Sequence, residues 1–533
     1  MKTSPVRVPE LSRKLNKDKV VTAAVAVAAI QSGDTIATGG FVGTGFAEQL
    51  TIALEERFLQ TGEPRNLSLI YAAGQGDGKT RGLNHLGHEG MVARVIGGHW
   101  GLVPKLQKLA VENKIIAYNL PQGIISTMFR DIAAKKPRTI SAVGLGTFVD
   151  PRNGGGKINA ATTEDLVELI TFDGEEYLAY KTLPIDVALL RGTTADPAGN
   201  ITMEKEALTL EVLAIAIAAR NSGGKIIVQV ERIADLGTLN PRQVKIPGIF
   251  VDYVVVSEPE NHWQTFGEKY NPAYSSEIKV PLKSIPPMAM GPRKVIARRA
   301  AFELTVGDIV NLGIGMPEGV SDVVNEEGML DQIIMTAEPG VIGGIPAGGL
   351  SFGAASNTDA IIDQPYQFDF YDGGGLDITF LGMAQADMAG DVNVSKFGSN
   401  LAGAGGFINI SQNASKVIFL GTFTAGGLKV AIEAGQLRII QEGTAKKFVR
   451  GTVEHVTFSG AYAAKRGQKV VYITERCVFI LTADGLELTE IAPGIDIQKD
   501  ILDQMDFTPI IKGIPRLMDS QIFLPAPMGM KLS

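Results

Sequence analysis

One glutamate in this chain stands where a carboxylate could act as a nucleophile or a base. The run QIIMTA has the pattern of a buried strand, Glu338 follows it, and Pro339 and Gly340 end the strand. A carboxylate there lies at the carboxyl end of a strand, which is the functional edge of an open α/β sheet. The loop that follows, to Ala355, is glycine-rich and uncharged. An ionised glutamate in water-poor surroundings is a strong nucleophile; the alternative is an ordinary exposed turn.

Two glycine clusters could complete such a site. The segments Gly403–Gly406 and Gly313–Met316 both offer backbone N–H groups that can approach a substrate closely. Two such donors aimed at one oxygen form an oxyanion hole, which stabilises a tetrahedral intermediate. The sequence contains no G-x-S-x-G motif, no Cys/His pair and no H-E-x-x-H motif that would support another nucleophilic or metal-assisted chemistry.

The remaining glycine-rich loops do not match nucleotide-binding motifs. The segment Ala73–Thr80 resembles a P-loop, but the first position is Ala73 rather than glycine and the following RGLNHLGHEG is a poor helix. The segment Gly39–Gly45 has the spacing G-G-x-x-G-x-G, which is not the dinucleotide fingerprint. Five scattered histidines and one cysteine do not favour a structural zinc site. We expect Cys477, within the apolar run CVFIL, to be a buried and inert thiol.

Composition places these motifs in a globular protein of more than one domain. The chain has 533 residues, of which 45% are hydrophobic and 20% charged. A net charge of −7 argues against a nucleic acid or an anionic membrane surface as partner. No apolar run reaches the roughly 18 residues of a membrane-spanning helix, and the N-terminus lacks the apolar region of a secretory signal. A reducing, cytoplasmic location is expected.

The elements that must position the motifs alternate along the chain. Runs of apolar and β-branched residues, such as NLSLIYAA and LDITFLG, are separated by helical patterns, which favours parallel α/β sheets. The stretch Asn271–Lys294 is rich in Pro and Ser and is expected to connect two halves. The prediction is therefore two related open-sheet α/β domains in one chain, residues 1–270 and 295–533, joined by a linker at 271–294.

An internal repeat supports the two halves. In each, a helix is followed by a Gly-Asp or Ser-Gly-Asp turn, a strand and a glycine loop. A clearer match aligns Pro184–Glu204 with Gly375–Ser395 without a gap, a strand followed by an Asp-x-x-Gly turn in each half. The coinciding pairs are Asp186/Asp377, Leu190/Leu381, Ala195/Ala386, Asp196/Asp387, Ala198/Ala389 and Gly199/Gly390. Duplication and fusion explain this pattern, and a site is expected where the halves meet.

These segments together resemble the family I coenzyme A transferases, most closely the single-chain propionate/acetate (short-chain acyl) branch. The resemblance runs over nearly the full chain and includes GDTIATGGF, IGGHWGLVPKLQ, LLRGTTADPAGN, NLGIGMPEGV, EPGVIGGIPAGGLSFGAA and GAGGFINISQ. The Glu-Pro-Gly-Val-Ile-Gly-Gly segment is specific to this branch, because succinyl-CoA:3-oxoacid transferases have Ser-Glu-Asn-Gly there. The fused halves resemble the separate subunits of other members.

The resemblance also implies roles for individual residues. Glu338 matches the glutamate that forms a covalent thioester with coenzyme A. Gly406 and Met316 match the two backbone donors of the oxyanion hole, and Gln385 matches the amide that orients the nucleophile. The residues implied to contact the coenzyme are Ala402, Gly403, Gly405, Gly315 and Lys429. Lys429 is the implied phosphate contact, with a plain surface lysine as the alternative.

The implied reaction moves coenzyme A between a short-chain acyl-CoA and a carboxylic acid, through an acyl-glutamyl anhydride and a glutamyl-CoA thioester, without a metal. Partners are then acyl-CoA and acids such as acetate, propionate, butyrate and acetoacetate, and the assembly is a homotetramer. The first half is expected to supply the acyl pocket, from Gly39–Phe46, Gly97–Trp100 and Tyr118–Gly123. One or more of Phe41, Phe46, Met128 and Phe129 are expected to set its depth. Two alternatives remain open: an acyl-CoA hydrolase on the same scaffold, and a non-catalytic binding protein.

Overall fold

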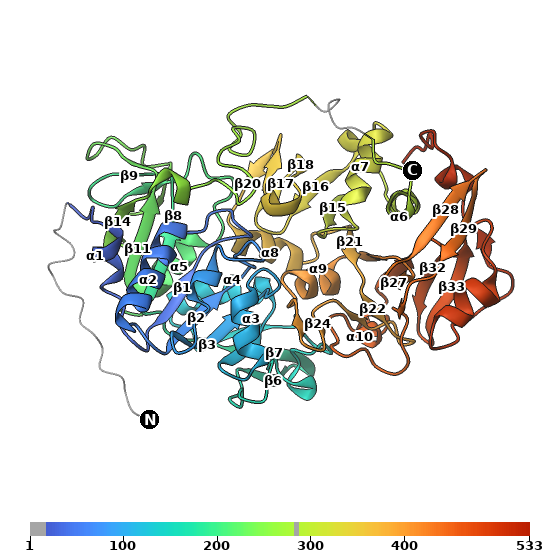
Figure 1. Ribbon diagram of the computed structural model, residues 1–533, viewed down its shortest axis with the longest axis horizontal. Helices are drawn as coiled ribbons and strands as arrows, with labels where there is room; N and C mark the ends of the chain where they lie inside the picture. Colours follow the sequence, from blue (N-terminus) through green and yellow to red (C-terminus); the bar gives the residue numbers. More distant parts are fainter. Residues whose placement is uncertain (1–17, 282–286, 533) are drawn as a thin grey trace.

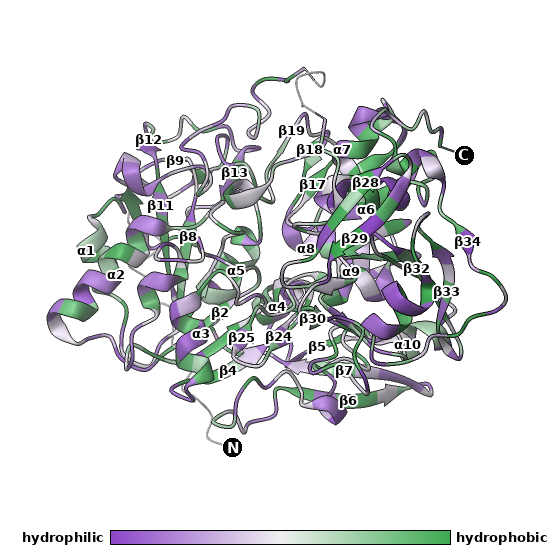
Figure 2. Ribbon diagram, turned by 45° about the vertical axis from the view of Figure 1, so that its right-hand side comes forward, coloured by the Kyte–Doolittle hydropathy of each residue, from purple (hydrophilic) through white to green (hydrophobic). Residues whose placement is uncertain are grey.

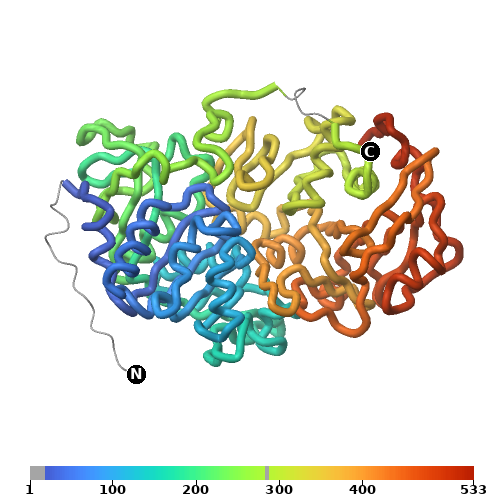
Figure 3. The backbone as a smooth tube through the Cα atoms, viewed as in Figure 1, coloured from blue at the N-terminus to red at the C-terminus, as the bar shows by residue number. Residues whose placement is uncertain are grey.

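The computed structural model describes residues 18–281 and 287–532. Two large sheets occupy opposite sides of the molecule, one built from strands before residue 257 and one from strands after residue 308 (Figure 1). The tube in Figure 3 follows the chain from the blue and green first half to the yellow and red second half. The first 17 residues, on which the absence of a secretory signal is predicted, and residues 282–286 of the expected linker lie outside the described residues.

The sheet of the first half is wholly parallel, as the alternating pattern predicts. Its strands are short apolar runs, and all five residues of its central strand VALLR are buried, as is typical of a sheet covered on both faces. In spatial order the strands are β14 (Tyr253–Val256), β11 (Lys225–Val230), β8 (Val187–Arg191), β1 (Thr35–Thr38), β2 (Leu67–Tyr71), β3 (Val92–Gly97) and β4 (Ile116–Asn119).

Amphipathic helices accompany this sheet. In α2 (Glu48–Thr61), Leu50, Ala53 and Leu54 are buried, whereas Leu59 is exposed, and Figure 2 shows hydrophobic and hydrophilic segments side by side along this helix. The others are α1 (Ala23–Val27), α3 (Pro104–Val111), α4 (Gln122–Ala133) and α5 (Val212–Asn221). The sequence pattern over residues 17–31 predicts a longer helix than α1, which spans only Ala23–Val27. Two smaller sheets contain β5 (Arg138–Ser141), β7 (Glu175–Lys181), β6 (Val167–Phe172), and β12 (Arg232–Ile233), β9 (Thr194–Ala195), β10 (Ile201–Thr202), β13 (Val244–Ile246).

The sheet of the second half is mixed rather than wholly parallel. Its centre is parallel, but antiparallel strands extend it on both sides. The run KVVYITERCVFIL folds back at its polar residues Thr474–Arg476 into two antiparallel strands. The order is β20 (Ala360–Ile361), β17 (Val341–Ile342), β16 (Ile334–Ala337), β15 (Ile309–Leu312), β21 (Ile378–Gly382), β26 (Lys416–Leu420), β31 (Lys469–Ile473), β32 (Cys477–Thr482), β33 (Gly485–Ile491) and β34 (Arg516–Leu517).

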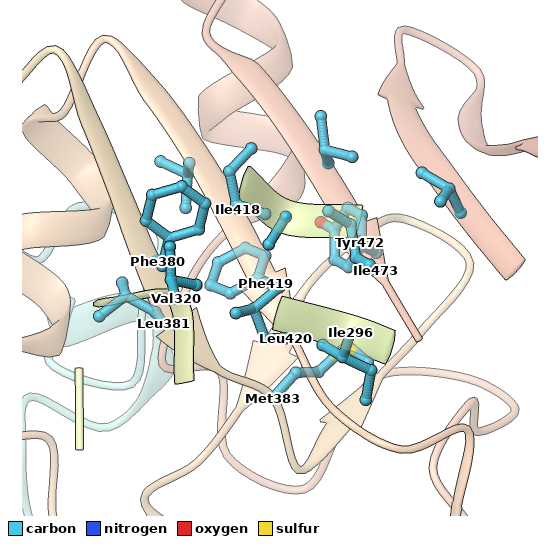
Figure 4. Close-up of a cluster of buried hydrophobic side chains, with 14 of the residues drawn as sticks. Ile296, Val320, Phe380, Leu381, Met383, Ile418, Phe419, Leu420, Tyr472 and Ile473 are labelled. Atoms are coloured by element: carbon cyan, nitrogen blue, oxygen red, sulfur yellow. The ribbon is translucent and has the colours of Figure 1, made fainter. Parts of the chain in front are cut away.

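A continuous hydrophobic core holds this second sheet to its helices. Phe380, Ile418, Phe419 and Tyr472 from three neighbouring strands are fully buried and pack with Ile296 and Val320 of the helices (Figure 4). Cys477 is buried and free, as its apolar run predicts, and burial raises the pKa of its thiol. The helices of this half are α6 (Pro292–Ala301), α7 (Glu318–Glu326), α8 (Gln364–Asp372), α9 (Phe407–Asn413) and α10 (Gly460–Lys465).

The repeat read from the sequence has the same local structure in both halves. The carboxylate of Asp186 accepts a hydrogen bond from the N–H of Thr35 at 2.9 Å, and that of Asp377 accepts one from Ile309 at 2.9 Å. Each aspartate thereby fixes the start of the strand beside its own. The two Asp-x-x-Gly turns are also alike, with Gly199 donating to Asp196 O and Gly390 to Asp387 O. The fused two-domain architecture therefore repeats one strand arrangement.

The halves are joined by an extensive contact around α4, α8 and α9. Arg130 of α4 forms a two-pronged ion pair with Asp369 of α8, with one N–O distance of 2.8 Å. The buried Gln364 donates to Ser126 Oγ at 2.6 Å, and Asn409 accepts from the Gly123 N–H at 3.1 Å. In the part of the chain that the structure describes, no helix is long and apolar enough to cross a membrane.

Candidate active site

A cavity of about 470 Å³ lies where the two halves meet. From the second half it is lined by residues at the carboxyl ends of four adjacent parallel strands, β16, β15, β21 and β26. The first half contributes the loop residues Phe41, Val42, Gly74, His99 and Leu102, and also Gln122 at the start of α4. We call this space the central cavity. Its position agrees with the expectation of a site between pseudo-equivalent halves.

Glu338 lines the central cavity directly after β16. Burial raises the pKa of its carboxyl group to about 7, and interaction with the side chain of Gln122 opposes this rise. The Gln122 Nε2 lies outside normal hydrogen-bond geometry with every described residue. No cation is among the causes that act on Glu338. Its charged form is therefore poorly solvated, which is the condition under which a carboxylate is most reactive.

Gly406 lies against the Glu338 carboxylate. A Cβ atom at Gly406 would come within 2.1 Å of Glu338 Oε2 and 2.9 Å of its Cδ, so any other residue there would displace the carboxylate. Its N–H makes no hydrogen bond to a described residue, whereas those of Gly405 and Phe407 on either side donate to the protein. Among the described residues, this leaves one backbone donor of the loop free beside the Glu338 carboxylate.

The loop that carries Gly406 is held by the first half. The N–H of Gly405 donates to Gly98 O at 2.7 Å, and Trp100 N donates to Ala402 O at 2.7 Å. Ala404 N donates to the buried Asn119 side chain at 2.9 Å. Because these bonds come from strand-end segments of the other half, the position of the free Gly406 N–H depends on both halves.

His99 is a neutral side chain of the central cavity. Burial lowers its pKa to about 4, so its ring carries no charge near pH 7. A Cβ atom at Gly405 would lie 3.7 Å from His99 Cδ2 and 3.6 Å from Gln122 Oε1. His99, Gln122 and Gly405 are therefore neighbours around the nucleophile candidate. His99 Nδ1 is buried and has no hydrogen-bond partner in the described part of the chain.

The end of the cavity at the first half is apolar. Phe41 and Phe352, one from each half, face each other with ring centroids 5.7 Å apart, and Val42 and Leu102 lie beside them. Of the four residues considered for pocket depth, Phe41 lines the cavity. Phe46, Met128 and Phe129 are buried in the core of the first half and are not part of the lining.

The structure brings together most, but not all, of the residues implied by the resemblance. The cavity lining contains Glu338, Gly406, Met316, Ala402, Gly403 and Gly405. Gln385, Gly315 and Lys429 are not part of it. Gln385 accepts a hydrogen bond from Asn393 at 3.0 Å, Gly315 O accepts one from Arg293 at 2.8 Å, and Lys429 is exposed at the start of β28 (Lys429–Glu433).

The lining also contains His99, Gln122 and Lys447, to which the sequence assigned no individual role. Gln122 and His99 fall within segments expected to form the acyl pocket, so only their place beside Glu338 was missing. Lys447 stands next to Lys446 in the run AKKF and carries no distinguishing signal. Within residues 18–281 and 287–532, no group of three or more His, Cys, Asp or Glu side chains is arranged to hold a metal ion.

Comparison with known proteins identifies the family of this fold and site. The model of the family described as coenzyme A transferase matches residues 20–257. The chain is 50% identical over 511 residues to caffeate CoA-transferase from Acetobacterium woodii, covering 95% of this chain and 97% of that protein. The chain therefore belongs to the coenzyme A transferase family, as its motifs suggest, and is an enzyme of that class.

Two further relatives connect sequence and structure. Acetate CoA-transferase YdiF from Escherichia coli K12 is 46% identical over 530 residues, covering 99% of both chains. The crystal structure of the YdiF apoenzyme from Escherichia coli O157:H7 matches with a TM-score of 0.92 over 97% of this chain and 98% of that one. A second YdiF structure, described as a thioester complex with CoA, matches with a TM-score of 0.91.

Proposed function

We propose that this enzyme moves coenzyme A between short-chain acyl-CoA (acetyl, propionyl, butyryl or acetoacetyl) and a short-chain carboxylic acid. The observation that supports this most is Glu338 itself. It lies at a strand end in the central cavity, in contact with Gly406 and without a countercharge. Coenzyme A is a substrate that becomes transiently covalent, and thioester exchange with a carboxylate needs neither ATP nor a metal.

In the proposed cycle, Glu338 attacks the acyl-CoA carbonyl carbon and expels the coenzyme A thiolate, leaving an acyl-glutamyl anhydride. The thiolate attacks the glutamyl carbonyl, releases the first acid as its carboxylate and leaves a glutamyl-CoA thioester. The second acid reverses both steps. Each tetrahedral intermediate carries its charge on one oxygen, which the N–H groups of Gly406 and Met316 stabilise. The apolar walls keep water from the anhydride.

The acyl group is an uncharged monocarboxylic chain in this proposal. The end of the cavity lined by Phe41, Val42, Leu102 and Phe352 offers no cation to a second carboxylate. The relatives named for acetate and for caffeate differ greatly in the size of the acid. The size of the acyl group is therefore inferred from the residues that line the cavity of this chain. The Phe41–Phe352 pair restricts that end and favours a short chain.

A kinetic experiment separates this function from its alternatives. The protein is incubated with acetyl-CoA and propionate, and propionyl-CoA and free thiol are measured separately. Transfer predicts propionyl-CoA without net thiol, and parallel double-reciprocal lines when both substrates are varied. Thiol that accumulates equally without propionate identifies an acyl-CoA hydrolase, for which His99 is the one imidazole in the cavity. If neither propionyl-CoA nor free thiol forms, the result identifies a non-catalytic binding protein.

Several assignments stay predictions. These are the domain boundaries at residues 270 and 295, the homotetramer, the cytoplasmic location, and the coenzyme contact of Gly315. Gln385 and Lys429 lie outside the central cavity, and other residues are proposed for their roles. For the group that orients Glu338 we propose Gln122, because its side chain acts on the Glu338 carboxyl.

A further inference from the structure

Lys447 is the only cationic side chain among the described residues that line the central cavity. The residue is 9% exposed, and its Nζ forms no hydrogen bond or ion pair with a described residue. Glu475 acts on it electrostatically, but the oxygens of Glu475 are already used by Arg476 Nε at 2.6 Å and Phe423 N at 2.9 Å. A buried ammonium group without a partner is costly. This arrangement is typical of an anion-binding site.

Strand geometry places Lys447 far along the cavity from Glu338. A Cβ atom at Gly421 would lie 2.7 Å from Lys447 Nζ, and Gly421 directly follows β26. Glu338 directly follows β16. The order β16, β15, β21, β26 makes three strand spacings between them, all in parallel pairs. At about 4.8 Å each, the separation is about 14 Å.

This separation matches the reach of the pantetheine arm. Thirteen covalent bonds separate the sulfur of coenzyme A from the phosphorus atom nearest to it. An extended chain advances about 3.8 Å for three bonds, so the arm spans about 16 Å. The cavity between the two ends is lined by strand-end backbone and by apolar side chains such as Leu381, Met383 and Leu420. A slightly bent arm that starts at Glu338 therefore ends at Lys447.

We propose that Lys447 binds the coenzyme phosphate that is attached directly to the pantetheine arm. The proposal rests on the transferase function, which places the sulfur at Glu338. Gly421 is part of the same subsite, because a Cβ atom there would crowd the ammonium group at 2.7 Å. The exposed Lys429, which the sequence suggests for a phosphate contact, lies outside the cavity and does not take this role.

The test measures binding, so it does not require turnover. Dissociation constants for coenzyme A, 4′-phosphopantetheine and pantetheine are measured by calorimetry near pH 7 with the wild-type protein, Lys447→Met and Lys447→Arg. Lys429→Met is the matched control. Lys447→Met is expected to weaken binding of coenzyme A and of 4′-phosphopantetheine by the same factor, about 10- to 100-fold, which is the usual contribution of a hydrogen bond to a charged group. Pantetheine binding stays unchanged, Lys447→Arg retains most of the affinity, and Lys429→Met equals wild type.

Three results would overturn the assignment. One is an equal loss for pantetheine, which lacks any phosphate. Another is a loss for coenzyme A that is absent for 4′-phosphopantetheine, which would move the contact to a more distant phosphate. The third is no loss in Lys447→Met. If Lys447→Met does not fold, wild-type protein that binds 4′-phosphopantetheine no better than pantetheine has the same meaning. Propionyl-CoA formation by wild type is scored separately, so a failed phosphate test leaves the transferase function standing.

Discussion

The two halves of this chain share one arrangement of four parallel strands, which we call the frame. They differ in the residues at the carboxyl ends of those strands. In each half an aspartate side chain accepts from the first N–H of the neighbouring strand, and the orders β2-β1-β8-β11 and β16-β15-β21-β26 are equivalent. In this register Ser68 corresponds to Ile334. Four residues further along, the first half has Ala72 and the second half has Glu338.

The same register also compares the outermost of the four strands, β11 in the first half and β26 in the second. Lys225 corresponds to Lys416, since each pairs with the first residue of its neighbouring strand. Five residues further along stand Val230 in the first half and Gly421 in the second. Val230 is buried in the core, whereas Gly421 leaves room for the Lys447 ammonium group. The same frame therefore carries buried core residues at its strand ends in the first half and residues of the central cavity in the second. A few substitutions account for this difference.

The largest effect is expected when the Glu338 carboxylate, which the first half lacks, is removed. Glu338→Ala is expected to lower kcat for transfer from acetyl-CoA to propionate by about 10⁴-fold or more, the usual effect of deleting a nucleophile. The double variant Ala72→Glu with Glu338→Ala is expected to stay inactive, because Ala72 is buried at the other edge. Turnover is measured together with thermal unfolding. Activity retained by Glu338→Ala in folded protein would contradict the assignment of the nucleophile.

A smaller effect is expected from a single methyl group at the reactive edge. Gly406→Ala brings a Cβ atom to within 2.1 Å of Glu338 Oε2, which displaces the carboxylate from the free N–H. We expect kcat to fall by about 10²- to 10³-fold, as when one oxyanion donor is lost. Gly382→Ala is the matched control, since Gly382 lines the same cavity and its Cβ meets no atom within 4 Å. Equal rates for the two variants would argue against the role of Gly406.

The ionisation of Glu338 predicts a pH dependence. Burial raises its pKa to about 7, so the carboxyl is protonated and unreactive below that pH and ionised above it. The rate of enzyme–CoA adduct formation in a single turnover is expected to rise about tenfold per unit up to pH ~7 and then level off. His99→Gln should leave the inflection in place, because His99 is already neutral throughout this range. A rate constant that does not change from pH 5 to 8 would show that another group limits the step.

The smallest predicted effect concerns the apolar end of the cavity. Phe41→Ala removes one ring of the Phe41–Phe352 pair and is expected to raise the ratio of kcat/KM for butyryl-CoA over acetyl-CoA by about tenfold, the lower range for one or two methylenes in an apolar pocket. Met128→Leu is the control, because Met128 is buried in the core of the first half outside the lining. An unchanged ratio in Phe41→Ala would place the acyl chain elsewhere.

Local patterns in the sequence predict the shared strand arrangement and the position of Glu338 well. The Glu-Pro-Gly end of a strand, the glycine clusters and the Asp-x-x-Gly repeat are contiguous motifs whose geometry is set by their own residues. Glu338, Gly406 and Met316 accordingly lie in one cavity. The mixed second sheet was not anticipated, because antiparallel and parallel buried strands have the same apolar composition.

Contacts across the halves are what the sequence does not contain. Gln122 and His99 reach Glu338 only because α4 and the Gly97–Trp100 segment dock on the loop at Gly403–Gly406. Lys446 and Lys447 are adjacent, yet Lys446 pairs with Asp506 at the surface while Lys447 lines the cavity. Which of two neighbouring lysines is buried depends on tertiary contacts with residues such as Gly421 and Asp506. These contacts are not visible in the sequence, which points to Lys429 instead for a phosphate contact.

The most direct test of the account is the mass of the protein after incubation with acetyl-CoA alone. Without an acceptor acid, the account predicts a species heavier by one coenzyme A minus one water, carried by the peptide that contains Glu338. The species is absent in Glu338→Ala and is lost after borohydride reduction or on addition of propionate. If no adduct forms while thiol accumulates, or if the coenzyme is attached to another residue, the glutamyl-CoA mechanism is contradicted.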